Sequence, residues 1–452
     1  MGSTTTQPSV QDPHMSERAM LRRFFDSAID SVSAARVMPR SLPSPQHGRV
    51  ALIAVGKAAA AMADVALDRI PAPTAALVVS RYGHMTDKLA ARTGIELVEA
   101  GHPYPDAQSI RAAERALEIA DSLEAQDHLL LLLSGGGSAL LAAPAHGISL
   151  SDKQATTRAL LESGATIAEI NCVRKHLSRI KGGRLALAAG PASVTTLIIS
   201  DVPGDDPSFV SSGPTVPDHT TLDMAREILR KYGIAAPTSI LAALENPANE
   251  TPPADSLGIA GVETVIIARA RDALCAAAKE ATSAGYVVMD LGDQLQAEAR
   301  HLGASHAALA RRLSVDGKQR AIISGGETTV TVQNRQGKGG RNLEYLLGLA
   351  IALDGAPGVA ALACDTDGID GTEDAAGAVV LPDTLARAQQ LGLDAAEHLR
   401  TNNAYLFFAA LGDLVITGPT RTNVNDFRVI LINGAAASGC RRARSLDQGF
   451  GK

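Results

Sequence analysis

The chain of 452 residues contains no tryptophan, and aromatic residues make up only 3% of it. Its core must therefore be aliphatic, which suits parallel strands covered by helices on both faces. Cysteine is scarce as well, and its spacing argues against a disulfide framework and favours a reducing, cytoplasmic environment. The four cysteines lie far apart in the sequence and form no CxxC pair: Cys172, Cys275, Cys364 and Cys440.

Long apolar runs and long basic runs are also missing. No apolar run approaches the ~20 residues of a membrane span, so we expect no membrane partner. The net charge is −6, and no basic stretch is interleaved with aromatic residues, so nucleic acid is not an expected partner either. The polar start, residues 1–14, lacks the apolar core of a signal peptide and is interpreted as a disordered leader before Met15.

What is abundant is an alternation of apolar runs with helical periodicity. An amphipathic helix is predicted from Ser16, with an apolar face that includes Leu21 and Phe25. Further helices are predicted over Ala58–Ile70, Ala107–Leu123 and Asp152–Ser163, and strands over Val50–Val55, Ala75–Val79, Ile95–Val98, Leu129–Leu133 and Val194–Ile199. This alternation predicts a doubly wound, mostly parallel sheet in an α/β domain spanning 15–245.

A polar, proline-rich segment divides the chain, and we place a linker at 246–258. A second α/β domain is expected at 259–435, followed by a basic, disordered tail at 436–452. Its strands are predicted at Val262–Ala268, Tyr286–Met289, Arg320–Ile323, Thr328–Gln333, Val359–Ala363, Asp413–Ile416 and Phe427–Ile432. Several alternate apolar with polar residues, which favours a mixed sheet with antiparallel pairs. Chemistry is expected in the cleft between the two domains.

A glycine-rich loop follows the predicted strand that ends at Leu133. It consists of Ser134, Gly135, Gly136, Gly137 and Ser138. Glycines allow a ligand to approach the backbone closely, and successive N–H groups at the start of a helix attract anions. The loop therefore indicates phosphate binding, although a tight strand-to-helix turn would use the same residues.

Basic residues lie at two further positions that favour the binding of an anion. Lys57 opens the helix after the first strand, where a cation opposes the helix dipole unless an anion is present. Between Asn171 and Gly183 the helical periodicity gathers Asn171, Arg174 and Lys175 on one face, with Lys181 nearby. Such a cluster suits a polyphosphate, while the alternative in both cases is a solvated basic surface.

Acidic residues follow two other predicted strands. Asp201 lies just past Ile199, and Asp367 lies in an Asp-rich turn past Ala363. Carboxylates at strand ends can hold Mg²⁺ or accept a proton, although each could also be a turn residue. The second half repeats the loop chemistry with Ser324–Thr328, which contains Glu327, and with Arg341 after three glycines.

Taken in order, nine motifs resemble those of glycerate 2-kinases with a C-terminal MOFRL domain, a family formerly named hydroxypyruvate reductases. They are Val55–Ala58, Ala100–Pro103, Leu133–Ala139, Asn171–Lys175, Lys181–Gly183, Ile199–Gly204, Ser324–Thr328, Gly339–Glu344 and Asp365–Gly371. The resemblance covers nearly the whole chain from Met15 to Ile432. It implies two α/β domains, D-glycerate and ATP as small-molecule substrates, and Mg²⁺.

The resemblance and the residue chemistry together suggest a role for each candidate. Lys57 and Arg341 match residues implicated in the family, and with Asp201 they are the expected catalytic residues. Ser134–Ser138, Asn171, Lys175 and Lys181 are expected to bind phosphate; Arg174, Glu327 and Arg341 to bind substrate; Asp201 and Asp367 to hold the metal. A homodimer is possible. The alternatives are a nicotinamide-dependent hydroxypyruvate reductase, whose dinucleotide fingerprint the chain lacks, and a non-catalytic sensor of sugar-acid phosphates.

Overall fold

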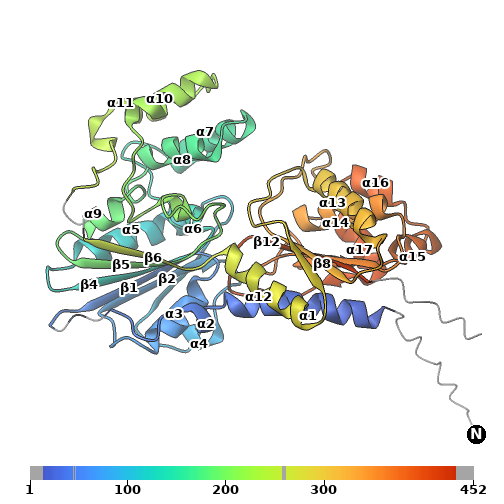
Figure 1. Ribbon diagram of the computed structural model, residues 1–452. Helices are drawn as coiled ribbons and strands as arrows, with labels where there is room; N and C mark the ends of the chain where they lie inside the picture. The colour runs from blue at the N-terminus through green and yellow to red at the C-terminus, as the bar shows by residue number, and fades with distance from the viewer. Residues whose placement is uncertain (1–13, 44, 46, 257–260, 434–452) are drawn as a thin grey trace, which may run out of the picture.

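A computed structural model describes residues 14–43, 45, 47–256 and 261–433, and it contains two six-stranded sheets (Figure 1). All but the last residue of the expected leader, the end of the expected linker and the whole expected tail lie outside these residues. No helix within the described ranges is both long and apolar enough to cross a membrane. Cys172, Cys275 and Cys364 are free, and Cys440 is not described.

The first sheet is parallel throughout, with the order β3-β2-β1-β4-β5-β6. Its strands are β1 (Val50–Val55), β2 (Ala75–Arg81), β3 (Glu96–Ala100), β4 (His128–Leu133), β5 (Ser193–Ile199) and β6 (Val262–Ala268). Alternate residues of β1 face two different cores: Leu52 lies with α3 (Ala59–Leu67), and Ile53 with α5 (Ala107–Asp121). The predicted doubly wound sheet is confirmed. Helices bury both of its faces, which is why its strands are continuous apolar runs.

The second sheet is mixed, with the order β11-β10-β9-β12-β8-β7. Its strands are β7 (Val287–Asp290), β8 (Arg320–Ser324), β9 (Val359–Asp365), β10 (Gly377–Val380), β11 (Leu414–Val415) and β12 (Asp426–Ile432). Only β7 and β8 pair in parallel. Helices α13 (Ala299–Ser314), α14 (Arg341–Leu353) and α17 (Ala404–Leu411) cover one face, and α1 (Met15–Ser31) and α12 (Ala270–Ser283) cover the other.

Antiparallel pairing was predicted correctly, but the strand predicted at Thr328–Gln333 is wrong. This segment forms only an isolated bridge at Thr329. Its backbone bonds instead to the segment before α13: Thr329 N–H donates to the Ala297 carbonyl, and Thr331 N–H to Glu298 Oε1. β10, which contributes two antiparallel pairs, was not predicted.

The expected ranges 15–245 and 259–435 do not coincide with the two sheets. β6 pairs in parallel with β5 and completes the first sheet, although it follows the expected linker. Conversely, α1 packs against α12, β9 and β12 of the second sheet. An apolar stripe shows that a helix needs a partner but does not specify which sheet provides it. The described part of the linker is also packed, since Glu250 accepts a hydrogen bond from Leu222 N–H.

A layer of helices with its own apolar core stands above the first sheet (Figure 1). It contains α7 (Leu150–Glu162), α8 (Ile167–His176), α10 (Leu222–Lys231) and α11 (Thr238–Glu245). α8 is capped by Thr166 and ends at His176, so the helical periodicity predicted through to Gly183 fails beyond that point. The chain turns there through Gly182 and Gly183, both of which have positive φ.

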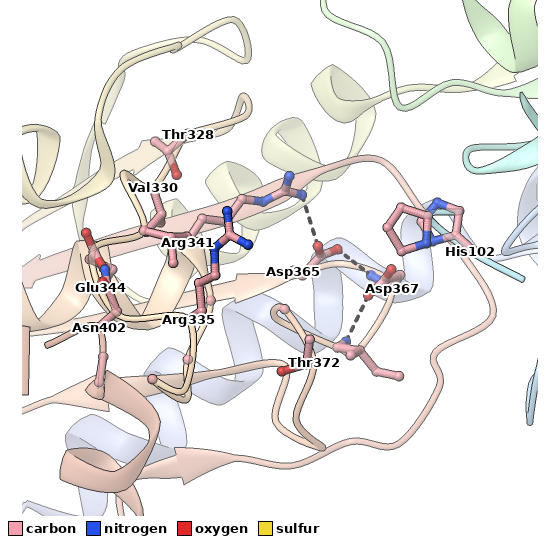
Figure 2. A pocket seen from close by; sticks show the side chains of 18 of the residues that line it. His102, Thr328, Val330, Arg335, Arg341, Glu344, Asp365, Asp367, Thr372 and Asn402 are labelled. Atoms are coloured by element: carbon pink, nitrogen blue, oxygen red, sulfur yellow. Dashed lines mark hydrogen bonds and ion pairs between the residues drawn. The ribbon is translucent and has the colours of Figure 1, made fainter. Parts of the chain in front are cut away.

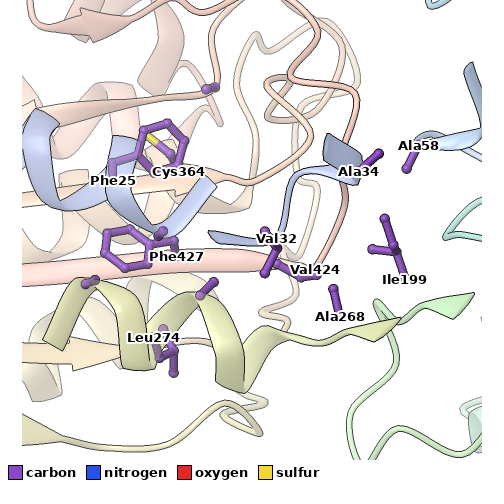
Figure 3. Close-up of a cluster of buried hydrophobic side chains, with 14 of the residues drawn as sticks. Phe25, Val32, Ala34, Ala58, Ile199, Ala268, Leu274, Cys364, Val424 and Phe427 are labelled. Atoms are coloured by element: carbon purple, nitrogen blue, oxygen red, sulfur yellow. The ribbon is translucent and has the colours of Figure 1, made fainter. Parts of the chain in front are cut away.

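The remaining short helices are α2 (Ala34–Val37), α4 (Asp87–Ala90), α6 (Gly137–Leu140), α9 (Arg184–Ala188), α15 (Thr384–Gln390) and α16 (Ala395–Arg400), with 3₁₀ turns at Val210–Ser212 and Pro247–Asn249. A single apolar core joins the two sheets (Figure 3). Val32, Ile199 and Val424 lie where the two parts meet, and Phe25 packs against Phe427 with ring centroids 5.8 Å apart. This shared core fixes how the ends of the two sheets face each other.

Candidate active site

The candidate residues meet where strand ends of the two sheets face each other. Lys57 follows β1, the glycine loop follows β4, and Asp201 follows β5. From the second sheet, Asp365 ends β9 and Asp367 follows it. The carboxyl ends of parallel strands lie at one edge of the sheet, so Lys57, the glycine loop and Asp201 are expected to lie close together there. Their approach to Asp367 required the tertiary structure.

Lys57 joins the two halves of the site. Its Nζ lies 2.6 Å from Asp367 Oδ2, and its backbone N–H donates to the Gly135 carbonyl at 2.9 Å. Burial disfavours the charge, but Asp367, Asp365 and Asp201 outweigh it, so the pKa of Lys57 is raised. Lys57 is therefore an ammonium group set among carboxylates that favour its charged form.

The glycine loop is shaped by its neighbours. A Cβ at Gly135 would overlap Asp201 Oδ2, one at Gly137 would overlap Ser211 Oγ, and Gly136 has φ +84°. Close packing therefore explains why glycine is needed in this loop, but it does not engage the backbone N–H groups of the loop. None of the N–H groups of Gly135–Ser138 donates a hydrogen bond to any residue that the structure describes. The hydroxyl of Ser134, by contrast, is already engaged, because its Oγ accepts a hydrogen bond from Ala58 N–H.

Asp201 lies against this loop. Its Oδ2 accepts a hydrogen bond from Asn423 Nδ2 at 2.7 Å, and its carbonyl accepts one from Asn425 Nδ2. Burial raises the pKa of Asp201 to about 6, even though Lys57 lowers it. Oδ1 accepts no hydrogen bond from another described residue. The structure therefore leaves one oxygen of this carboxylate open to a cation or a proton.

Arg341, at the start of α14, is held by three carboxylates, of which Figure 2 shows Asp365. Its Nε donates to Asp426 at 2.8 Å, Nη1 to Glu327 at 2.6 Å and Nη2 to Asp365 at 3.0 Å. These acids outweigh the cost of burial and raise its pKa. Glu327, itself a predicted substrate-binding residue, thus bonds Arg341 directly, and three of the five donors of Arg341 are already engaged. Asp426 could not be predicted as a partner from the sequence, because it lies 85 residues away along the chain.

Two hollows open from this centre. The first hollow, of about 700 Å³, extends over the second sheet past Asp365 and Asp367 towards Arg335 and Thr372 (Figure 2). The second hollow, of about 560 Å³, extends under the helical layer past Gly136 and Ser138. Both are lined by Lys57, His102, Pro103 and Arg341. The site thus offers two separate compartments that meet at Lys57.

The basic residues predicted on α8 divide into two groups. Arg174 and Lys181 line the second hollow, and both donate to Ser138 Oγ, at 2.6 and 3.1 Å. Lys175 instead pairs with buried Asp218 at 3.1 Å, and Asn171 accepts from Ser212. Neither of these two lines either hollow. The structure does not bring Asn171 and Lys175 to the site.

Three residues lining the hollows were missed or left open in the sequence. Lys153 on α7 lines the second hollow, and Arg81 at the end of β2 lines the first, 3.9 Å from Asp367. Arg81 could have been predicted from the sequence, because it ends a strand of the parallel sheet. No feature of the sequence indicated Lys153. His102 faces both hollows, and burial, together with Lys57 and Arg81, lowers its pKa to about 3. It is therefore a neutral imidazole.

The metal prediction has one fitting ligand. The described residues contain no group of three or more His, Cys, Asp and Glu side chains arranged to hold a metal ion. Mg²⁺ on a nucleotide needs only one or two carboxylates, because phosphates and water complete its shell. Asp201, with its open Oδ1, fits this role, whereas Asp367 already accepts from Ile369 N–H through Oδ1 and pairs with Lys57 through Oδ2.

Comparisons with known proteins cover most of the chain. Residues 20–245 match a family model described as a domain of unknown function, DUF4147, and residues 320–426 match the MOFRL family. A D-glycerate 2-kinase from Thermotoga maritima is 40% identical over 410 residues, covering 90% of this chain and 96% of that protein. An Agrobacterium vitis protein, provisionally named a hydroxypyruvate reductase, is 49% identical over 424 residues, covering 92% and 95%.

A crystal structure of a glycerate kinase from Thermotoga maritima superposes with a TM-score of 0.81 at 39% identity, covering 92% of this chain and 99% of that one. Identity and structural similarity at this level over nearly the full length of both chains show a shared fold. The chain belongs to the family of glycerate kinases that carry a C-terminal MOFRL domain.

Proposed function

We propose that this protein transfers the γ-phosphate of ATP to the 2-hydroxyl of D-glycerate, giving 2-phosphoglycerate, with Mg²⁺. The observation that carries the proposal is Lys57, a charged ammonium at the junction of two compartments. Phosphoryl transfer needs two substrates placed in line and a cation at the transferred group, and little else from the protein. The names of the relatives support glycerate as the acceptor.

The residues divide the work as follows. The free N–H groups of Gly135–Ser138 bind phosphate oxygens, and Lys57 stabilises the charge that develops on the transferred group. Asp201 accepts the proton of the attacking hydroxyl or holds the metal through Oδ1. Bound Mg²⁺ would neutralise the phosphates and orient them for in-line attack. Asp365 and Asp367 keep Arg341 and Lys57 in position, and Arg341 uses its remaining donors for the glycerate carboxylate or the γ-phosphate.

The test combines product identity with one variant. The wild-type protein is incubated with ATP, Mg²⁺ and D-glycerate, and ³¹P and ¹H NMR distinguish 2-phosphoglycerate from 3-phosphoglycerate. Lys57→Met should lower kcat by about 10²–10⁴-fold, because removing one charge-stabilising group costs a few kcal/mol in the transition state. Lys279→Met is the matched control, since Lys279 is exposed on α12 and pairs with no described residue. Equal rates for wild type and Lys57→Met would refute the role of Lys57.

The name of the Agrobacterium relative makes a reductase the natural competitor. Oxidation of NADH on addition of hydroxypyruvate, without formation of a phosphorylated product, would replace the proposed function with that activity. Binding of a phosphorylated sugar acid with no turnover in Mg-ATP would instead support a sensor.

A further inference from the structure

Three cations, two on the helical layer and one in the turn after α8, line the second hollow and pair with no carboxylate among the described residues. Lys153, Arg174 and Lys181, called here the cationic trio, all line this hollow. Their donors are satisfied by neutral oxygens: Lys153 Nζ by the Leu177 carbonyl at 2.8 Å, Lys181 Nζ by the Ser138 carbonyl at 2.9 Å and Arg174 by Ser138 Oγ. None of the three pairs with an acid among the described residues. Buried charge of one sign normally has a counter-charge, so its absence here points to an anionic ligand.

The charge balance distinguishes the trio from other basic residues nearby. Lys175, one residue after Arg174, has its counter-ion in Asp218. Burial lowers the pKa of Lys153 to about 7 and that of Arg174 to about 10, and Arg174 and Lys153 also lower the pKa of Lys181. The three groups therefore destabilise one another. A ligand with several negative charges relieves this, whereas the single carboxylate of glycerate would leave most of it in place.

The rim of the same hollow is apolar and exposed. Tyr104, Leu161 and Ile167, called here the apolar rim, are 59%, 57% and 60% exposed, and all three line the second hollow. They come from the loop after β3, the end of α7 and the first residue of α8. The Arg158 guanidinium lies 5.8 Å from the centre of the Tyr104 ring, which leaves a planar, partly aromatic surface at the mouth. A flat heteroaromatic ring matches such a surface in shape and polarity.

We infer that the second hollow is the nucleotide half of the site, with the cationic trio on the polyphosphate and the apolar rim on the base. This deepens the proposed function and rests on it for the direction of transfer. Gly136 and Ser138 of the glycine loop, whose N–H groups donate to no described residue, line the same hollow together with Lys57, so the terminal phosphate points to the junction. The first hollow, with Arg81 and Arg335, is then left for the glycerate carboxylate.

Two variants separate the parts of this assignment. Lys153→Met keeps most of the side-chain stem and removes one charge from the trio. Ile167→Asp places a carboxylate in the rim, where the first turn of α8 favours an acid, so the helix should be retained. Leu391→Asp is the control for the second variant, because Leu391 is 58% exposed at the end of α15, outside both hollows. Lys279→Met again controls for the loss of a lysine.

Binding is measured by titration calorimetry with Mg-ADP, adenosine and D-glycerate as separate probes, independently of turnover. We expect Lys153→Met to weaken Mg-ADP at least tenfold and leave adenosine unchanged, and Ile167→Asp to weaken both by three- to tenfold. Unchanged Mg-ADP affinity in both variants, or a loss of D-glycerate affinity instead, would overturn the assignment. Arg174→Gln, which removes another charge of the trio, replaces Lys153→Met if that protein fails to fold. Wild-type protein that binds Mg-ADP but phosphorylates no glycerate would refute the proposed function and leave the nucleotide site standing.

Discussion

Asp201 is a residue whose proposed chemical role reduces the stability of the folded protein. Packing against Gly135 and Asn423 removes its carboxylate from water, and the pKa rises to about 6 from an ordinary value of 3.8. The ionised form is therefore less favourable in the folded protein than in the unfolded chain. This cost is absent below pH 3.8 and fully present above about pH 6.

Replacing Asp201 by Asn should consequently stabilise the protein while reducing its activity. A shift of about 2 units corresponds to roughly 3 kcal/mol at pH 8, and the gain should shrink as the pH falls through 6. Urea denaturation at pH 8 and pH 5 measures the stability, and the kinase assay measures the activity. An Asp201→Asn protein that is active and no more stable than the wild type would contradict both roles of Asp201.

Lys153 makes a further prediction at the scale of single residues. Burial, then Arg174 on α8, Arg184 on α9 and Arg179 between these helices lower its pKa to about 7, and the Leu177 carbonyl is its hydrogen-bond partner. A bound polyphosphate favours the charged form and raises this pKa. Binding should then take up a proton between pH 7.5 and 9, and Mg-ADP affinity should fall by up to tenfold per pH unit across that range.

Calorimetric titrations in buffers of different ionisation enthalpy measure this proton uptake directly. Lys153→Met should abolish the component due to Lys153 without changing that of Mg-ADP itself. A wild-type protein with no uptake in this range would show that the Lys153 charge is not coupled to the nucleotide.

At the scale of elements, the loop after β4 depends on the absence of a side chain rather than on flexibility. Gly135 leaves space that Asp201 Oδ2 and Asn423 Nδ2 occupy, so β4 and β5 present their loops in contact. The loop thereby fixes the distance between the phosphate donors and the acid.

Gly135→Ala should displace Asp201 and lower kcat by about 10²-fold or more, because misplacement by about 1 Å is costly in phosphoryl transfer. The loss should exceed that expected from any change in thermal stability, which circular dichroism measures. Gly261→Ala, ahead of β6, is the control, since a Cβ there meets no described atom within 4 Å. A fully active Gly135→Ala protein would show that the approach of Asp201 to the loop is not needed.

At the scale of the whole molecule, the two sheets share one apolar core. α1 crosses from the start of the chain to the second sheet, and β6 returns from beyond residue 260 to the first. Each sheet therefore depends on a segment adjoining the other in sequence. Such a core is expected to unfold cooperatively rather than sheet by sheet.

Phe25→Ala tests this coupling. The ring is fully buried and packs against Phe427, so its removal should cost about 3–5 kcal/mol. Scanning calorimetry should show one main transition covering both sheets, shifted down as a unit in the variant. Two separate transitions, of which only the one belonging to the second sheet moves, would disprove a shared core.

Local features of the fold can be predicted from short stretches of the sequence. Runs such as Leu129–Leu133, flanked by glycine, predict buried strands, and the residues after parallel strands lie at one edge of the sheet. Lys57, Ser134–Ser138 and Asp201 could therefore be predicted to lie together. The tertiary structure decided every feature that depends on a distant partner. It placed β6 in the first sheet and surrounded Arg341 with carboxylates. It also gave Lys175 a counter-ion, while Lys153, Arg174 and Lys181 have none among the described residues. The physical reason is that apolar periodicity acts over neighbouring residues, whereas charge compensation depends on which segments the fold brings together.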